Sequence, residues 1–274
     1  MCLILFSFQP STDRPLVLGA NRDEFFDRPT APADYWEDTP QVLAGRDLLA
    51  GGTWLGITAS GRFAAVTNVR EPQVVTKRKL LSRGDLTRHF LQGDEAPQAY
   101  LKRLSADKDN YAGFNLLLGD FSDEPSSIFY FSNRCAGIHS LTEGTYGLSN
   151  HLLNSPWPKV DDGITILRQG LTMAEGNHDF IRDLLEHPST AEDDRLPDTG
   201  VSYAKEKALS AIFIASLPNY GTRASSVLTI DYQRIKFSEQ DYRASEDGSP
   251  NPDGPARYFQ FDRTNPRPVI AGVK

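Results

Sequence analysis

The chain has 274 residues, 39% of them hydrophobic and 24% charged, which is the composition of a soluble globular protein long enough to bury its own core. Its net charge of -7 argues against a large nucleic-acid-binding surface, and the longest basic run, residues 77–79, is too short to alter this. Two cysteines, Cys2 and Cys135, are too few for a disulfide framework and suit a reducing compartment.

The first apolar segment, residues 1–8, predicts a buried strand and not a targeting or membrane segment. It is too short to span a membrane, and it lacks the basic start and small-residue cleavage site of a secretory signal. Cys2 stands where a myristoylation pattern needs glycine. We therefore expect a cytoplasmic protein without a membrane span.

The remaining predicted elements follow in chain order. A second strand at residues 16–21, after a turn-rich segment with two prolines, predicts an antiparallel hairpin with the first. Further strands are predicted at residues 42–44, 54–58, 63–67, 114–118, 127–131, 137–141, 146–149, 211–215, 225–231, 234–237 and 258–261. Helices are predicted at residues 85–91, 96–104, 160–174 and 179–187. Residues 188–200 predict a surface loop, and residues 244–255 a mobile one.

The order of these elements indicates the fold class. Strands come in runs, with the helices in two blocks between them, which is not the alternation of a doubly wound parallel sheet. The pattern favours an α+β sandwich with mostly antiparallel sheets. Because the chain shows neither a fixed-period repeat nor a low-complexity block, we expect one domain over residues 1–274.

Cys2 is a candidate nucleophile because of its position. A methionine aminopeptidase removes Met1 when the second residue is small, and removal would leave Cys2 with a thiol and a free α-amine. An α-amine has a pKa of about 7.7–8.0, so it can act as a general base for the thiol near neutral pH. The sequence alone does not decide whether Met1 is removed.

The predicted hairpin places a charged cluster, Asn21-Arg22-Asp23-Glu24, next to Cys2. If its turn is centred on Thr12, Cys2 lies opposite Arg22, but a one-residue slip would put Asn21 and Asp23 on the face of Cys2 instead. Asp23 could hold the α-amine, and Arg22 could favour the thiolate. The alternative to a catalytic site is a purely structural role, in which Cys2 is a small buried residue of the core and the charged cluster is a solvated end of the hairpin. The sequence alone decides neither between the catalytic and the structural role nor between the two registers.

Several segments together resemble the NRDE family, the proteins related to transport and Golgi organisation protein two. The resemblance starts at Met1 and Cys2 and runs through the Asn-Arg-Asp-Glu cluster. It continues at residues 51–56 (GGTWLG), 65–70 (AVTNVR), 148–151 (LSNH), 155–159 (SPWPK) and 220–223 (YGTR). These segments span most of the chain and are specific in combination.

The resemblance implies a four-layer αββα sandwich of the N-terminal-nucleophile (Ntn) hydrolase type, similar to penicillin V acylase and bile salt hydrolase. Carried over, it makes Cys2 the nucleophile and Asp23 the holder of the α-amine. Asn68 or Asn150 would stabilise the oxyanion, and Arg223 would be a pocket arginine. One position departs from bile salt hydrolases, which have an arginine three residues before the aspartate where this chain has Ala20.

Two functions are therefore expected as alternatives. The first is an N-terminal-cysteine amidohydrolase acting on a small amide or N-acyl compound, in whose site Asn21 and Arg22 also take part. The second, implied by relatives linked to haem trafficking, is a non-enzymatic carrier of haem or another hydrophobic ligand in the same pocket; a silent scaffold is a third. The histidines lack metal-ligand spacing, so no metal or resident cofactor is expected, and His151 is expected to make a local hydrogen bond.

Overall fold

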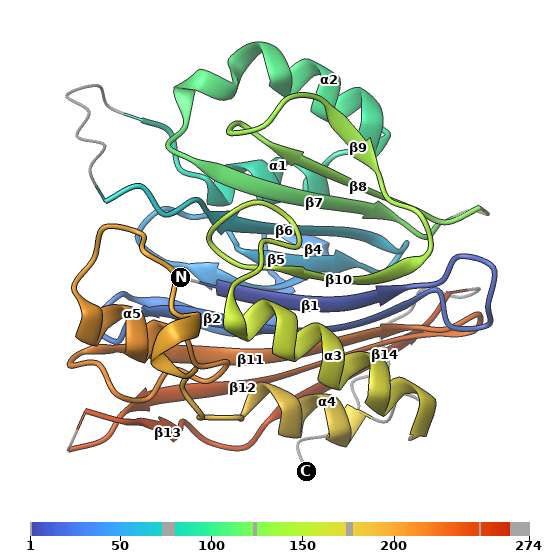
Figure 1. The fold of residues 1–274 in the computed structure, drawn as a ribbon. Helices are drawn as coiled ribbons and strands as arrows, with labels where there is room; N and C mark the ends of the chain where they lie inside the picture. Colours follow the sequence, from blue (N-terminus) through green and yellow to red (C-terminus); the bar gives the residue numbers. More distant parts are fainter. Residues whose placement is uncertain (1, 73–79, 123–124, 174–177, 247, 264–274) are drawn as a thin grey trace.

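The structure is a computed structural model that describes residues 2–72, 80–122, 125–173, 178–246 and 248–263. Two antiparallel sheets pack face to face between two layers of helices (Figure 1). This confirms the expected four-layer αββα sandwich with antiparallel sheets. No helix in the described part of the chain is long and apolar enough to cross a membrane. Met1 and the basic run at residues 77–79 lie outside the described residues.

The first sheet carries the N-terminal hairpin at its centre. Its strand order is β10-β1-β2-β11-β12-β13, and β14 also pairs with β12. The hairpin is therefore flanked by strands from the middle and the end of the sequence. The strands are β1 (Cys2–Phe8), β2 (Leu16–Phe25), β10 (Gly144–Leu148), β11 (Tyr220–Ile230), β12 (Arg234–Ala244), β13 (Pro250–Pro252) and β14 (Arg257–Asp262).

The second sheet is a meander in which each strand pairs with its neighbour in sequence. Most of these strands are joined by short connections, but the connection from β6 to β7 contains α1 (Gly84–Gln92) and α2 (Pro97–Asp107). The strands are β3 (Thr30–Trp36), β4 (Thr39–Asp47), β5 (Leu55–Thr58), β6 (Arg62–Asn68), β7 (Phe114–Asp120), β8 (Ser127–Ser132) and β9 (Ile138–Ser140).

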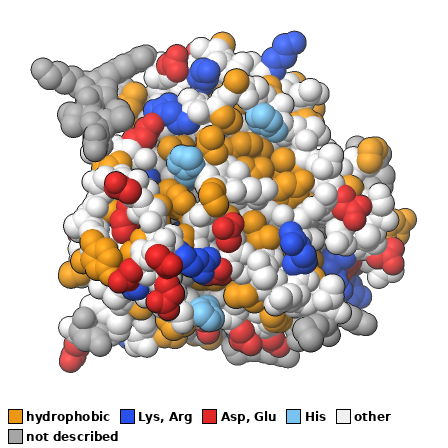
Figure 2. Space-filling model, in the orientation of Figure 1, with side chains coloured by type: hydrophobic (Ala, Val, Ile, Leu, Met, Phe, Trp, Pro, Cys, Tyr) orange, Lys and Arg blue, Asp and Glu red, His pale blue; other side chains and the backbone are white. Residues whose placement is uncertain are grey.

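The helices cover the outer faces of the two sheets. Helices α1 (Gly84–Gln92) and α2 (Pro97–Asp107) pack on the second sheet, and α3 (Pro158–Met173) and α4 (His178–Leu185) pack on the first (Figure 1). Helix α5 (Tyr203–Leu209) and two short 3₁₀ turns (Lys108–Asn110 and Asp193–Arg195) lie in the connections. On the face drawn in Figure 2, acidic and basic side chains are interspersed and do not gather into one basic area.

The alternation of side chains along β1 shows how the layers form. Ile4 and Phe6 belong to the core between the two sheets, whereas Leu3 and Leu5 pack against the helices that cover the first sheet. Both faces of the strand are buried, which is why its sequence is a continuous apolar run. By the same alternation the side chain of Cys2 points toward the second sheet.

Most of the predicted strands and helices are present, with boundaries shifted by a few residues, but the strand predicted at residues 211–215 is wrong. This segment is held by hydrogen bonds outside a ladder: Phe213 N donates to the His187 carbonyl at 3.0 Å, and Ile214 N to Thr222 Oγ1 at 2.9 Å. Its residues are apolar and most of them are buried, and this apolar run led to the prediction of a strand. Strand β3 and helix α5 were not predicted, and the loop predicted at residues 244–255 contains β13.

Candidate active site

Cys2 begins β1 and lies directly opposite Arg22 of β2, as predicted for a turn centred on Thr12. Directly opposite residues of an antiparallel pair share one face of the sheet, so Arg22 lies on the face of Cys2. Asn21 and Asp23 project from the other face, toward the helices. The structure therefore decides between the two registers that the sequence left open.

Cys2 and Arg22 line a cleft of about 490 Å³ at the edge of the core between the sheets. A row of four residues, one from each of four neighbouring strands, contributes the first-sheet side of the cleft: Cys2, Arg22, Ala224 and Asp241. The second sheet contributes Thr30, Gly45 and Val66, among others. Cys2 as a whole residue is half-buried where it lines the cleft.

Asp23 is fully buried on the opposite face of β2, behind Cys2. Its Oδ1 accepts a hydrogen bond from Thr222 Oγ1 at 2.9 Å, and its Oδ2 lies 3.9 Å from Nζ of Lys159, which is also buried. Burial raises the pKa of the Asp23 carboxyl, while Lys159 and the Thr222 hydroxyl act to lower it. Burial likewise lowers the pKa of Lys159, against the pull of Asp23. Each charged group thus stabilises the other in a dry environment.

Asn150 fixes the start of β1. Its Oδ1 accepts a hydrogen bond from the backbone N–H of Cys2 at 3.3 Å, and its Nδ2 donates to the carbonyl of Asn68 at 2.9 Å. The neighbouring Ser149 hydroxyl donates to the Cys2 carbonyl at 3.0 Å. The amide of Asn150 is therefore used to hold backbone, whereas the exposed side chain of Asn68 lines the cleft beside Cys2.

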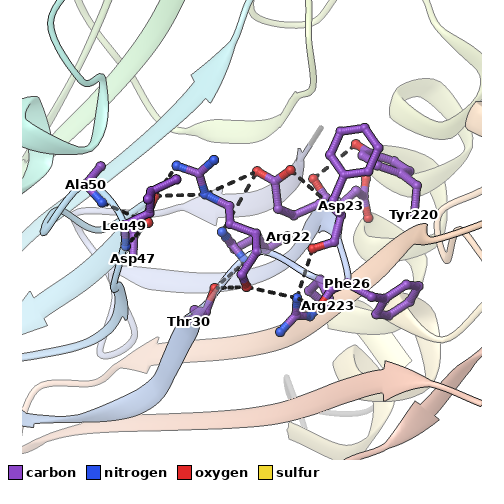
Figure 3. Close-up of polar contacts among 12 residues, drawn as sticks. Arg22, Asp23, Phe26, Thr30, Asp47, Leu49, Ala50, Tyr220 and Arg223 are labelled. Carbon is purple, nitrogen blue, oxygen red and sulfur yellow. Dashed lines mark hydrogen bonds and ion pairs between the residues drawn. The ribbon is translucent and has the colours of Figure 1, made fainter.

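Arg223 occupies a β-bulge, because the pairing of β2 with β11 shifts register between Thr222 and Ala224. A bulge re-aims a side chain, and here the guanidinium turns under the end of β2. Its Nη1 donates to the carbonyls of Phe25, Phe26 and Arg28 at 2.8–3.3 Å. Figure 3 shows Arg223 beside Phe26, with Arg22 and Thr30 next to it. Arg223 lines the cleft and also shapes the chain that leaves β2.

The charges around Cys2 act in opposite directions on its thiol. Burial raises the pKa of the thiol, and the charge of Asp23 raises it further. Arg22 and the backbone N–H of Asp23 act to lower it. A thiol in this setting needs a base to become a nucleophile, because burial alone favours its neutral form.

The structure brings most, but not all, of the predicted site residues to the cleft. Five of them line it: Cys2, Arg22, Asp23, Asn68 and Arg223. Asn150 stands behind Cys2, as described above. Asn21 lies away from the cleft, because its Nδ2 donates to the carbonyls of Leu185 and Ile212 at 2.8 and 2.9 Å. These bonds tie the first sheet to the end of α4 and to the segment after α5.

Sequence reasoning missed three residues of this neighbourhood. Lys159 and Thr222, which contact Asp23, lie inside the segments 155–159 and 220–223 that carried the resemblance, so their position was a signal that could have found them. Arg83 precedes α1 and lines the cleft, and no motif marked it.

The described residues contain no group of three or more His, Cys, Asp or Glu side chains placed to hold a metal ion. His151 makes the expected local hydrogen bond, with 2.6 Å between its Nδ1 and Ser155 Oγ. Both cysteines, Cys2 and Cys135, are free thiols.

Proteins of similar sequence cover nearly the whole chain. The family model described as Transport and Golgi organisation 2 matches residues 1–244. A Bos taurus protein named Transport and Golgi organization protein 2 homolog is 36% identical, over 90% of this chain and 95% of that protein. The Homo sapiens homolog is 35% identical, over 88% of this chain and 92% of that protein. The Drosophila melanogaster protein of the same name is 29% identical, over 88% and 92%.

Two solved structures show a distant likeness. A Caenorhabditis elegans ortholog of N-acylethanolamine-hydrolyzing acid amidase has a TM-score of 0.48 at 10% identity, over 83% of this chain and 92% of that one. A C2A mutant of the conjugated bile acid hydrolase from Clostridium perfringens has a TM-score of 0.45 at 9% identity, over 100% and 95%. It is the family match and the sequence relatives that show where this protein stands: the chain belongs to the Transport and Golgi organisation 2 family.

Proposed function

We propose that the processed chain is an N-terminal-cysteine amidohydrolase that acts on a small amide or N-acyl compound. The observation that carries the proposal is the position of Cys2: the residue lines the cleft, and its backbone nitrogen is held by the side chain of Asn150. A reactive cysteine must be reachable by substrate and close to a base, and the α-amine freed by loss of Met1 would be such a base.

In this proposal the α-amine of Cys2 takes the proton of the thiol, and the sulfur attacks the carbonyl carbon of the substrate. A C–S bond forms, and the carbonyl oxygen becomes an oxyanion. The α-amine then gives the proton to the substrate nitrogen, the C–N bond breaks, and the amine product leaves. Water, deprotonated by the same amine, hydrolyses the remaining thioester and releases the acid.

Two side chains support the reacting groups in this scheme. The Asn68 side-chain amide lines the cleft beside Cys2, so it is the donor that we assign to the oxyanion, in preference to Asn150, whose amide binds backbone. Asp23 stabilises the protonated α-amine through its charge, and Lys159 and Thr222 keep the carboxylate in place.

The proposal is tested by replacing the thiol while keeping the processing. Alanine at position 2 is also small, so Cys2→Ala would still lose Met1 and retain an α-amine. Release of amine from a panel of N-acylated amines and amino acids should fall by about 1,000-fold or more in Cys2→Ala. Cys135→Ala, which removes the other free thiol, is the matched control and should keep full turnover.

The mass of the active protein completes this test. We expect the intact mass to correspond to a chain without Met1. Full turnover by Cys2→Ala, or activity of a chain that retains Met1, would contradict the proposal.

The alternative, a carrier of haem or another hydrophobic ligand in the same cleft, is a separate proposal with less support. All five histidines lie in the described part of the chain, and none of them lines the cleft. The cleft is instead lined by many charged side chains. Titration with haem, followed by Soret absorbance, tests this alternative. A change in the Soret band that saturates with added haem would favour it, and a change that does not saturate would exclude specific binding.

A further inference from the structure

Among the residues that the structure describes, the cleft is lined by six arginines and six acidic residues. Burying a guanidinium without a partner is costly, so each of them should be matched by a carboxylate, by backbone carbonyls or by a ligand. The cationic residues are Arg22, Arg28, Arg46, Arg83, Arg223 and Arg257.

Four of the six have strong partners within the protein. Three form close ion pairs: Arg28 with Asp47, Arg46 with Asp38, and Arg257 with Asp241, each at 2.6 Å. Arg223 donates to the three backbone carbonyls described above. These four guanidinium groups hold the walls of the cleft together, because each has a carboxylate or a set of backbone carbonyls as its partner.

Arg22 and Arg83 are held only weakly. Arg22 is 7% exposed, yet its two contacts are long: 3.4 Å from Nη1 to Thr30 Oγ1 and 3.9 Å from Nη2 to Glu24 Oε2. Arg83 makes one hydrogen bond, from Nη1 to the Gly113 carbonyl at 3.1 Å, and no carboxylate of the described residues forms an ion pair with it. Each guanidinium has five N–H donors, so within the part of the chain that the structure describes most of theirs have no strong acceptor.

Both weakly held arginines lie at the Cys2 end of the cleft. Arg22 is the direct cross-strand neighbour of Cys2, with about 5 Å between the Cβ atoms of such pairs. Arg83 lines the same cleft, and burial lowers the pKa of its guanidinium, an effect that the nearby acidic groups of Cys2 and Glu24 oppose. Asp241, by contrast, is three strands away from Cys2, or roughly 14 Å. The two weakly held guanidinium groups thus lie toward the Cys2 end of the cleft, whereas Asp241 at the far end is paired with Arg257.

We propose that Arg22 and Arg83 form an anion subsite beside Cys2, and that the substrate is an amide with a carboxylate a few bonds from the scissile carbonyl. A guanidinium matches a carboxylate with two parallel hydrogen bonds, which orients the substrate as well as binding it. An N-acylated α-amino acid has this spacing, since its carboxylate is separated from the amide nitrogen by one carbon. The substrate class rests on the proposed amidohydrolase function, whereas the subsite itself is a statement about binding.

The test uses two probes that differ only in charge: an N-acylglycine and the corresponding N-acylglycinamide. Binding to the processed, full-length protein is measured by calorimetry, with Cys2→Ser replacing wild type if turnover interferes. We expect the carboxylate probe to bind about tenfold more tightly or better, in line with a charge-assisted pair of hydrogen bonds. Arg83→Gln, which keeps the shape of the side chain without the charge, should reduce this preference to about twofold or less.

A control and a second variant complete the design. Arg103→Gln removes an arginine of α2 that pairs with Glu95 outside the cleft, and it should keep the full preference. Arg22→Gln should also lose the preference, provided that its thermal unfolding shows a folded protein. An N-acyl aminomethylphosphonate serves as a third probe, and tighter binding of this phosphonate would overturn the assignment to a carboxylate.

The outcomes separate the subsite from the proposed function. Preference for the carboxylate without turnover of either probe would support the subsite and contradict the amidohydrolase. Turnover of both amides with equal affinity would support the amidohydrolase and overturn the subsite. Failure of both probes to bind, or an unchanged preference in Arg83→Gln, would overturn the subsite as well.

Discussion

At the scale of single residues, the contact between Asp23 and Lys159 is the feature on which the candidate site depends most. Both side chains are buried, 3.9 Å apart, and Thr222 adds a hydrogen bond to the carboxylate. A buried ion pair adds little net stability compared with apolar residues, but removal of one partner leaves the other charge unpaired. The pair therefore matters because Lys159 opposes the effect of burial, which raises the pKa of the Asp23 carboxyl behind Cys2.

Lys159→Met should destabilise the protein strongly, because Asp23 would lose its cationic partner in a dry environment. We expect the free energy of unfolding to fall by about 3 kcal/mol, measured by denaturant titration. The double variant Lys159→Met with Asp23→Asn should recover part of this loss. Lys207→Met, which breaks the exposed ion pair of Lys207 with Asp193, is the control and should have a much smaller effect. Equal losses in the two lysine variants would refute this account of the pair.

A second buried carboxyl, Glu239, predicts a pH dependence of stability. It accepts hydrogen bonds from Ala33 N at 2.6 Å and from the Ser226 hydroxyl at 2.9 Å, and burial, aided by the charge of Asp241, raises its pKa to about 7. The unfolded chain has the ordinary value of about 4.3, so the folded protein binds the proton more tightly. The contribution of Glu239 to stability is therefore greatest at low pH and declines as the pH rises from about 4.3 to 7.

Glu239→Gln should remove this decline, since glutamine can accept from Ala33 N and donate to Ser226. The stability of wild type relative to the variant should fall by about 1–3 kcal/mol between pH 5 and pH 8. Chemical unfolding of both proteins at these two pH values measures it. A difference that is constant with pH, or that grows as the pH rises, would show that Glu239 does not titrate as described.

At the scale of elements, the approach of α1 to the second sheet sets the position of Arg83. A Cβ added to Gly52 would lie 2.4 Å from the carbonyl carbon of Gly84, the first residue of α1. Thr53 N donates to the Gly84 carbonyl at 3.3 Å, so the backbones touch directly. This explains the second glycine of the GGTWLG segment: it lets the start of α1 reach the cleft wall.

Gly52→Ala should push α1 away from β5, because the obstacle is backbone and cannot rotate aside. We expect a loss of about 1–3 kcal/mol of stability, measured by thermal or denaturant unfolding, and weaker binding of anionic probes through the displacement of Arg83. Gly51→Asn is the matched control: Gly51 has a φ of 77° with nothing within 4 Å of an added Cβ, and asparagine tolerates that conformation. A Gly52→Ala protein as stable as wild type would refute the close approach.

At the scale of elements, the predicted strands and helices can also be compared with those of the structure. The sequence predicted the hairpin and left two registers open, of which the structure has Cys2 opposite Arg22, and apolar runs or helical spacing located most other elements. Three features depend on long-range contacts and left no local pattern. The segment at residues 211–215 is held by His187 and Thr222, helix α5 follows a long connection, and Asn21 binds Leu185 and Ile212. Apolar composition alone does not distinguish such a segment from a strand.

At the scale of the whole molecule, the segments that carried the family resemblance converge on one place. Cys2 and the Asn-Arg-Asp-Glu cluster come from the hairpin, Asn68 from the end of β6, and Asn150 from the segment after β10. Lys159 begins α3, and Thr222 lies in β11. The resemblance predicted that these segments matter, but only the packing of four layers shows which side chains face the cleft and which stand behind it.

The central claim is that Cys2, freed of Met1, forms a covalent bond to the acyl group of an amide substrate. The most direct test is rapid acid quenching of the protein during turnover of an N-acyl substrate, followed by intact and peptide mass analysis. We predict a chain that lacks Met1 and carries one acyl group as a thioester on Cys2, with none on Cys135. Turnover with no acyl group on Cys2 at any quench time, or with the acyl group on another residue, would contradict the claim.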